Sequence, residues 1–135
     1  MQRTRLQGLL AIQTAYTNQK LGAMNPVTGA CAYESEGRNC VVGCLFSNAQ
    51  IVYLKTHRNF NASPTDPVPF LNDWGVQCLA KDGNIGVKNL EYVTGFGLDE
   101  LTTLQLMHDR EWKTIQTGCM NTELHRYLTK EKKAN

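Results

Sequence analysis

The sequence contains no apolar run near the roughly 18 residues that a membrane-spanning helix needs, which excludes a transmembrane helix. It also has little excess of either charge, because 14 basic and 12 acidic residues leave a formal net charge of +2. That balance is too mild to indicate a nucleic-acid coat. Hydrophobic residues make up 41% of the chain and charged residues 19%, which excludes disorder over most of its 135 residues. The length predicts a single domain, 1–135.

Cysteine pairing motifs are missing as well. There is no Cys-x-x-Cys, and the 5 cysteines cannot all pair within one chain because their number is odd. Structural zinc sites use paired ligands about two to four residues apart. Cys40 and Cys44 have that spacing, but His108 and His125, which would have to complete the site, fall in different predicted helices. We therefore expect free thiols, no metal and no cofactor.

Phosphate-loop and leader motifs are also absent. Neither G-x-x-x-x-G-K-[ST] nor G-x-G-x-x-G occurs, so no glycine-rich loop is available to cradle phosphate. The first residues, MQRTRLQGLLAIQTAY, are basic and then apolar, but Gln7 and Gln13 interrupt the apolar part and no small-residue cleavage site follows. We expect a cytoplasmic protein in a reducing compartment.

Three segments have the periodicity of helices. Residues 4–20 carry apolar side chains at helical spacing, and Gly22 follows where a C-cap glycine is common. Residues 98–115 form the strongest helical pattern in the chain. Asn121 or Thr122 can cap a last helix.

Residues 31–47 combine turn and apolar signals. Residues 35–38 predict a tight turn, and residues 40–45 form an apolar run too short to assign by periodicity. With Asn39 as the expected N-cap, we favour a hairpin turn followed by a helix; a second strand is the alternative. The chain as a whole predicts an α+β fold, with an N-terminal helix, a short β-hairpin and two or three further helices around one core.

A Pro-rich loop, 59–69, holds three of the 4 prolines and is the longest irregular stretch. Aromatic and Arg side chains supply much of the binding energy at interfaces, so we expect a partner contact here. The basic ends of the chain, including the basic tail 129–135, are a second candidate surface that would attract phosphate. The candidate binding residues at the loop are Arg58, Phe60, Phe70 and Trp74.

Cys40 is the sharpest candidate for chemistry. If it opens a helix, the free backbone amides there would lower the pKa of its thiol. His108 would then serve as the base, with Asp109 beside it. Neighbouring helix positions point in different directions, so Asp109 need not orient His108. Packing and capping are the competing explanation for all three residues.

Two segments resemble small uncharacterised proteins of tailed bacteriophages and prophages. The first reads CAY at 31–33 and GRNCVVGCL at 37–45, and the second reads LTTLQLMHD at 101–109, followed by Trp112. The resemblance covers most of residues 5–115, without the Pro-rich segment and residues 75–97. It implies a phage origin and a helix–hairpin–helix core, but no activity. The residues that carry this structural motif are Cys31, Tyr33, Gly37, Arg38, Gly43 and Gln105.

One arrangement would explain why the two segments occur together. If the second segment is a helix that packs on residues 40–45, then Gln105, His108 and Asp109 can hydrogen-bond the backbone of the turn at 37–39. That arrangement also brings Cys40 close to His108.

We interpret the chain as a small phage accessory protein that binds a host protein in the host cytoplasm. It would inhibit or redirect that protein, in host takeover or anti-defence. A cysteine-dependent enzyme with Cys40 as nucleophile and His108 as base is the first alternative. A nucleotide- or phosphate-binding protein is the second. Neither specific nucleic-acid recognition nor membrane association is expected.

Overall fold

A computed structural model describes residues 3–24, 34–46, 91 and 94–134, and the structural statements below concern these residues. Several expected site residues lie outside them, as does the Pro-rich loop 59–69. These residues are Cys31, Tyr33, Arg58, Phe60, Phe70 and Trp74.

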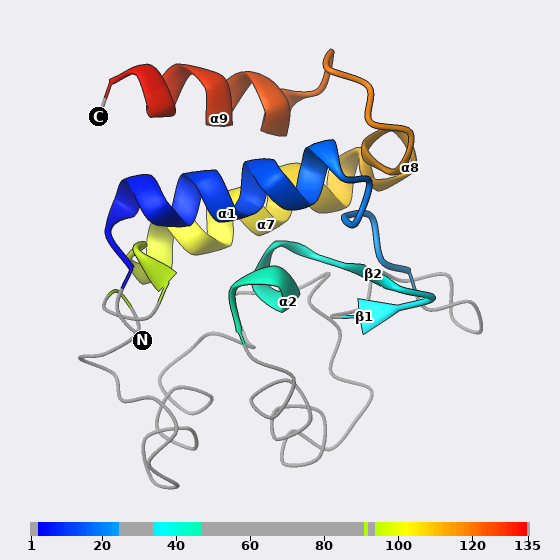
Figure 1. Cartoon of the computed structure of the whole chain (residues 1–135), viewed down its shortest axis with the longest axis horizontal. Helices are drawn as coiled ribbons and strands as arrows, with labels where there is room; N and C mark the ends of the chain where they lie inside the picture. Colours follow the sequence, from blue (N-terminus) through cyan, green and yellow to red (C-terminus); the bar gives the residue numbers. More distant parts are fainter. Residues whose placement is uncertain (1–2, 25–33, 47–90, 92–93, 135) are drawn as a thin grey trace, which may run out of the picture.

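The elements confirm the α+β class and the N-terminal helix (Figure 1). Four helices follow α1 in the described part, where two or three were expected. None of these helices is both long and apolar enough to cross a membrane. In chain order the elements are α1 (Arg5–Thr17), β1 (Glu34–Ser35), β2 (Arg38–Asn39), α2 (Val41–Leu45), α7 (Leu98–Arg110), α8 (Trp112–Gln116) and α9 (Glu123–Lys133).

The predicted hairpin is present at the expected place. Strands β1 and β2 are antiparallel, with Glu34 opposite Asn39 and Ser35 opposite Arg38. The two turn residues, Glu36 and Gly37, have φ angles of 54° and 78°. A two-residue hairpin turn needs positive φ at both positions, since that backbone twist matches the twist of the strands. The chain then enters α2, which confirms the predicted helix after the turn and excludes a strand over Val41–Leu45.

Helix α1 lies between α9 and the lower layer formed by α2 and the hairpin (Figure 1). It packs against both α9 and α2, and α7 packs against the same two helices. The apolar side chains of these helices meet in one buried cluster. Its largest fully buried members are Tyr16, Phe96, Leu9, Ile12, Leu21, Leu101, Leu104 and Ile115.

Two expected helix ends are wrong. Helix α1 ends at Thr17 with Asn18 as its C-cap, so Gly22 is not the cap. The predicted helix 98–115 breaks at Glu111, where φ is −130° and ψ is 29°. The break lets the Glu111 carboxylate accept a hydrogen bond of 2.8 Å from the backbone N–H of Glu123, the first residue of α9. Thr122 caps α9, as expected, by accepting from the N–H of His125 at 3.1 Å.

A charged network joins α1, α7 and α9. The Arg5 guanidinium donates to Glu100 through Nε at 2.9 Å and Nη2 at 2.6 Å, and Nη2 also reaches Glu131 at 2.6 Å. The Tyr127 hydroxyl donates to Glu100 at 2.5 Å. The hydrogen bond from Arg5 to Glu100 is the main reason that the pKa of Glu100 lies below its usual value of 4.5. Burial, followed by the hydrogen bond to Glu100, raises the pKa of Tyr127 to about 12.

We expect this network to make the free energy of unfolding fall at both ends of the pH scale. Because folding lowers the pKa of Glu100, its contribution is present above pH 4.5 and is lost as the pH falls through the lower folded pKa. Because folding raises the pKa of Tyr127 from 10.0 to about 12, stability is lost as the pH rises between those values.

Urea denaturation at a series of pH values checks this expectation. Glu100→Gln should flatten the acid limb, and Tyr127→Phe should flatten the alkaline limb between pH 10.0 and about 12. If either variant keeps the full slope of the wild-type chain in its own pH range, the network does not carry that part of the stability.

Candidate functional site

Cys40 caps a helix and is not an activated nucleophile. It is the N-cap of α2, and its Sγ accepts a hydrogen bond of 3.2 Å from the N–H of Gly43. The cap is therefore Cys40 and not Asn39, which belongs to β2 and whose N–H donates to the Lys20 carbonyl in the loop after α1. Cys40 is 0% exposed, and burial raises the pKa of its thiol well above the ordinary value. The expected lowering of this pKa is wrong because desolvation outweighs the hydrogen bonds from the backbone amides.

Cys44 follows the same pattern one turn later. Its thiol donates to the Val41 carbonyl at 3.1 Å, and burial raises its pKa to about 12. Burial therefore disfavours the thiolate form of both Cys40 and Cys44. Gly43, which lies between them, is buried, and its N–H donates the hydrogen bond that Cys40 Sγ accepts.

Gln105 and Asp109 connect α7 to the start of α2. The Gln105 side-chain oxygen accepts from the N–H of Val42 at 3.0 Å, and its Nε2 donates to Asp109 Oδ1 at 2.8 Å. The first amides of a helix have no partner within the helix, so a side chain from α7 satisfies this one. The expected role of Gln105 in bonding a backbone group is thus supported, but its target is Val42 and not the turn at 37–39.

His108 holds the loop after α1 against α7. Its Nε2 lies 3.0 Å from the backbone N of Gly22, which can only donate, so Nε2 is the acceptor. The ring proton is therefore on Nδ1, which donates to Asp109 Oδ1 at 2.9 Å. Asp109 does orient His108, although the two are adjacent in sequence. The imidazole is 0% exposed, so both of its nitrogens are committed inside the protein.

This arrangement leaves the expected catalytic pair without a free base. The lone pair that would take a proton from Cys40 is already occupied by the Gly22 amide. Within the described residues, no group of three or more His, Cys, Asp or Glu side chains could hold a metal ion. In the same part of the chain, Asp109 Oδ2 is buried without a hydrogen-bond partner. We name Gln105, His108 and Asp109 the α7 polar cluster; its chemistry is that of a structural crosslink.

Gly22 and Arg38 complete the junction around this cluster. Gly22 has a φ of +89°, and a Cβ there would lie 2.4 Å from Gln116 Cγ. Its carbonyl accepts from Gln116 Nε2 at 2.8 Å. Arg38 Nη1 donates to the carbonyls of Gln19 at 2.7 Å and Leu21 at 3.1 Å. Arg38 of the expected motif is therefore a structural residue that ties β2 to the loop after α1.

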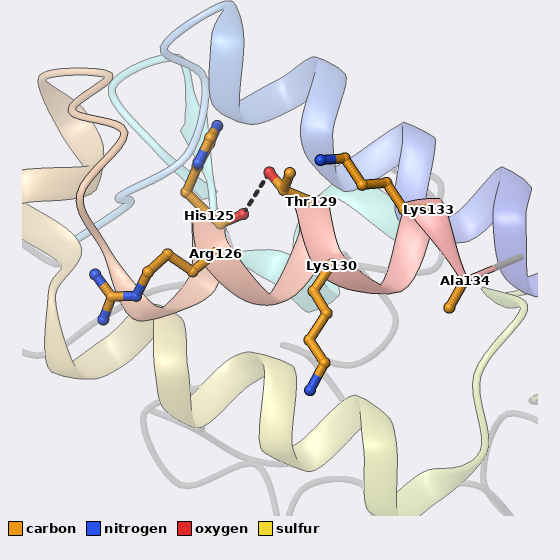
Figure 2. A pocket seen from close by; sticks show the side chains of 6 residues that line it. All are labelled: His125, Arg126, Thr129, Lys130, Lys133 and Ala134. Atoms are coloured by element: carbon orange, nitrogen blue, oxygen red, sulfur yellow. Dashed lines mark hydrogen bonds between the residues drawn. The ribbon is translucent and has the colours of Figure 1, made fainter.

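A group of exposed basic side chains lies apart from this cluster, on α9. A cavity of about 630 Å³ lies along this helix, and Figure 2 shows the side chains that line it. Three exposed basic residues, Arg126, Lys130 and Lys133, recur there at i, i+4 and i+7, and we name them the α9 cationic face. The predicted basic tail 129–135 included both lysines but missed Arg126, which the same helical spacing would have found. The cavity is lined by His125, Arg126, Thr129, Lys130, Lys133 and Ala134.

Comparisons of this chain with protein-family models, curated proteins and solved structures give no match. Its function is therefore argued from the buried α7 polar cluster and the α9 cationic face.

Replacing His108 tests the α7 polar cluster. His108→Leu removes the acceptor for Gly22 and the donor to Asp109, and each buried group left unpaired should cost about 1–3 kcal/mol. His108→Gln keeps an acceptor near Nε2, and His108→Asn keeps a donor near Nδ1, so each should recover part of the loss. Urea denaturation gives the free energies of unfolding. Equal stability of the Leu, Asn and Gln variants would contradict this account of the two hydrogen bonds.

Alkylation tests the state of the thiols. We expect iodoacetamide to modify exposed Cys119 rapidly in the native protein and to leave buried Cys40 unmodified until urea unfolds the chain. Half-buried Cys44, whose thiol donates to the Val41 carbonyl, should react more slowly than Cys119. Peptide mapping by mass spectrometry distinguishes these positions. Rapid native modification of Cys40 would show that its thiolate is accessible and would restore the nucleophile hypothesis.

Proposed function

We propose that the chain is a phage-encoded accessory protein that works by binding a host protein in the host cytoplasm and inhibiting or redirecting it. One observation carries the binding part of this proposal. The candidate nucleophile Cys40 and the candidate base His108 are both 0% exposed, and both form hydrogen bonds that hold the fold together. By contrast, three exposed basic side chains share the surface of α9, where they suit contact with a partner. The phage origin rests on the resemblance in the two sequence segments.

The cysteine-enzyme alternative has less support. A nucleophile must reach its substrate, and its base must have a free lone pair. Cys40 is buried with a raised pKa, and the Nε2 lone pair of His108 accepts from Gly22. Both requirements would need the α7 polar cluster to come apart.

The nucleotide or phosphate alternative has one favourable observation, the α9 cationic face. Phosphate sites, however, gather several convergent donors, often backbone amides at the start of a helix. The α9 cationic face runs along the side of its helix and ends in the last turn, where the helix dipole is negative. Arg58, Phe60, Phe70 and Trp74 stay candidate contact residues beside it.

Affinity purification from infected or protein-expressing host cells tests the proposal. We expect the tagged chain to retain one host protein in a stoichiometric complex, identified by mass spectrometry and reconstituted with the purified partner. Cys40→Ser keeps an acceptor for the Gly43 N–H and removes the thiol, so this variant should bind the partner with unchanged affinity.

Two outcomes would contradict the proposal. The first is that no stoichiometric partner is retained by the wild-type chain. The second is that Cys40→Ser loses its effect on the host while its melting temperature stays within a few degrees of wild type. The second outcome would favour the enzyme alternative.

A further inference from the structure

The α9 cationic face carries charge that the described part of the fold does not neutralise. Arg126 donates to the neutral Asn121 side chain at 2.9 Å, and within the described residues neither the Lys130 nor the Lys133 ammonium group has a hydrogen bond or ion pair. Arg5 provides the contrast, because two carboxylates bind it at 2.6 Å. Internal packing therefore does not require the positive charge of the α9 cationic face.

The spacing of these three charges is that of a single stripe. At about 1.5 Å per residue, positions i, i+4 and i+7 span roughly 10 Å along the helix axis. Like charges at this spacing weaken a helix. Basic residues in the last turn interact favourably with the helix dipole. Lys132 also makes that interaction, although its ammonium group donates to Gln13 Oε1 on α1 at 3.0 Å. The dipole accordingly does not explain why the other three basic side chains are exposed around the cavity, with Arg126 and Lys130 on one side of α9 and Lys133 on the other (Figure 2).

The surface between the charges is mostly carbon and is held in place. Thr129 and Ala134 contribute methyl groups to the cavity of about 630 Å³, together with the aliphatic stems of the basic side chains. The Thr129 hydroxyl donates to the His125 carbonyl at 2.9 Å (Figure 2). The His125 ring lies 5.3 Å from the ring of buried Tyr16. The floor of the cavity is thus anchored to the core, which lowers the entropic cost of docking.

We propose that the α9 cationic face is a docking site for an acidic amphipathic helix of the partner protein. Carboxylates at i, i+4 and i+7 of that helix would meet Arg126, Lys130 and Lys133, and apolar residues beside them would cover the cavity. This proposal rests on the proposed function, for which it names the partner's recognition element. Charge complementarity selects an acidic partner, and the carbon-rich cavity between the charges favours a peptide over a nucleic acid, whose contacts to basic side chains are mainly phosphates.

A binding assay with defined probes tests the docking site on the full chain. The probe is a fluorescent peptide of roughly 15 residues with Glu at i, i+4 and i+7, Leu beside them and Ala elsewhere. A scrambled peptide of the same composition is the control. We expect anisotropy to report binding that weakens with salt, and the scrambled peptide to bind at least roughly five-fold more weakly.

Paired variants locate the site. Lys130→Gln with Lys133→Gln should weaken binding of the peptide by roughly five- to ten-fold. Lys20→Gln with Lys113→Gln removes the same charge from exposed positions elsewhere and should leave binding unchanged. No binding of the peptide, equal binding of the scrambled peptide, or equal losses in the two double variants would each overturn the proposal. Displacement of the peptide by inorganic phosphate, ATP or a short DNA duplex at matched charge concentration would also overturn it and indicate a general anion site.

The same variants separate this proposal from the proposed function. If the host partner is captured equally well by the Lys130→Gln and Lys133→Gln double variant, the docking site is wrong while the binding function stands. If the acidic peptide binds as expected and no host partner is captured, the binding function is wrong while the docking site stands.

Discussion

The folded chain depends on a buried imidazole that accepts one hydrogen bond and donates another. His108 accepts from the Gly22 amide and donates to Asp109, which also accepts from Gln105. Gln105 in turn satisfies the free Val42 amide in the first turn of α2. A buried polar group without a partner is costly, so these bonds specify how the loop after α1, helix α2 and helix α7 meet. Position 22 requires glycine, because a Cβ there would lie 2.4 Å from Gln116 Cγ.

This constraint determines which residues are available for function. The sequence offers a histidine, a carboxylate and a cysteine, the residue types of a catalytic site. In the structure the first two form a crosslink, and the cysteine caps a one-turn helix. Burial raises the pKa of the Cys40 thiol, whereas reactivity would need the opposite. A group of exposed basic residues instead lies on α9, whose inner side packs on α1 and whose outer side no described helix or strand covers (Figure 1). The division between a committed interior and a charged exterior favours recognition over catalysis.

Local signals predicted the elements that depend on local chemistry. Positive φ at Glu36 and Gly37 follows from a tight turn, and Thr122 begins α9 because its hydroxyl can accept from an amide one turn on. The errors have long-range causes. Glu111 breaks the predicted helix 98–115, and its side chain binds the start of α9, a contact that periodicity does not report. Gly22 appeared to be a helix cap, but its role is set by α7 and α8.

The sequence by itself determined the α+β class, the N-terminal helix, the hairpin turn and the basic character of the C-terminal residues, which it assigned to a tail and the structure places in α9. These follow from periodicity, turn chemistry and charge within a few residues. Only the tertiary structure decided the state of Cys40 and His108, because desolvation and hydrogen-bond partners come from elements far apart in the chain. It also decided which basic residues are available to a partner: Arg5 forms ion pairs with Glu100 and Glu131, while Lys130 and Lys133 line the cavity on α9. Composition counts such charges equally, and packing alone distinguishes them.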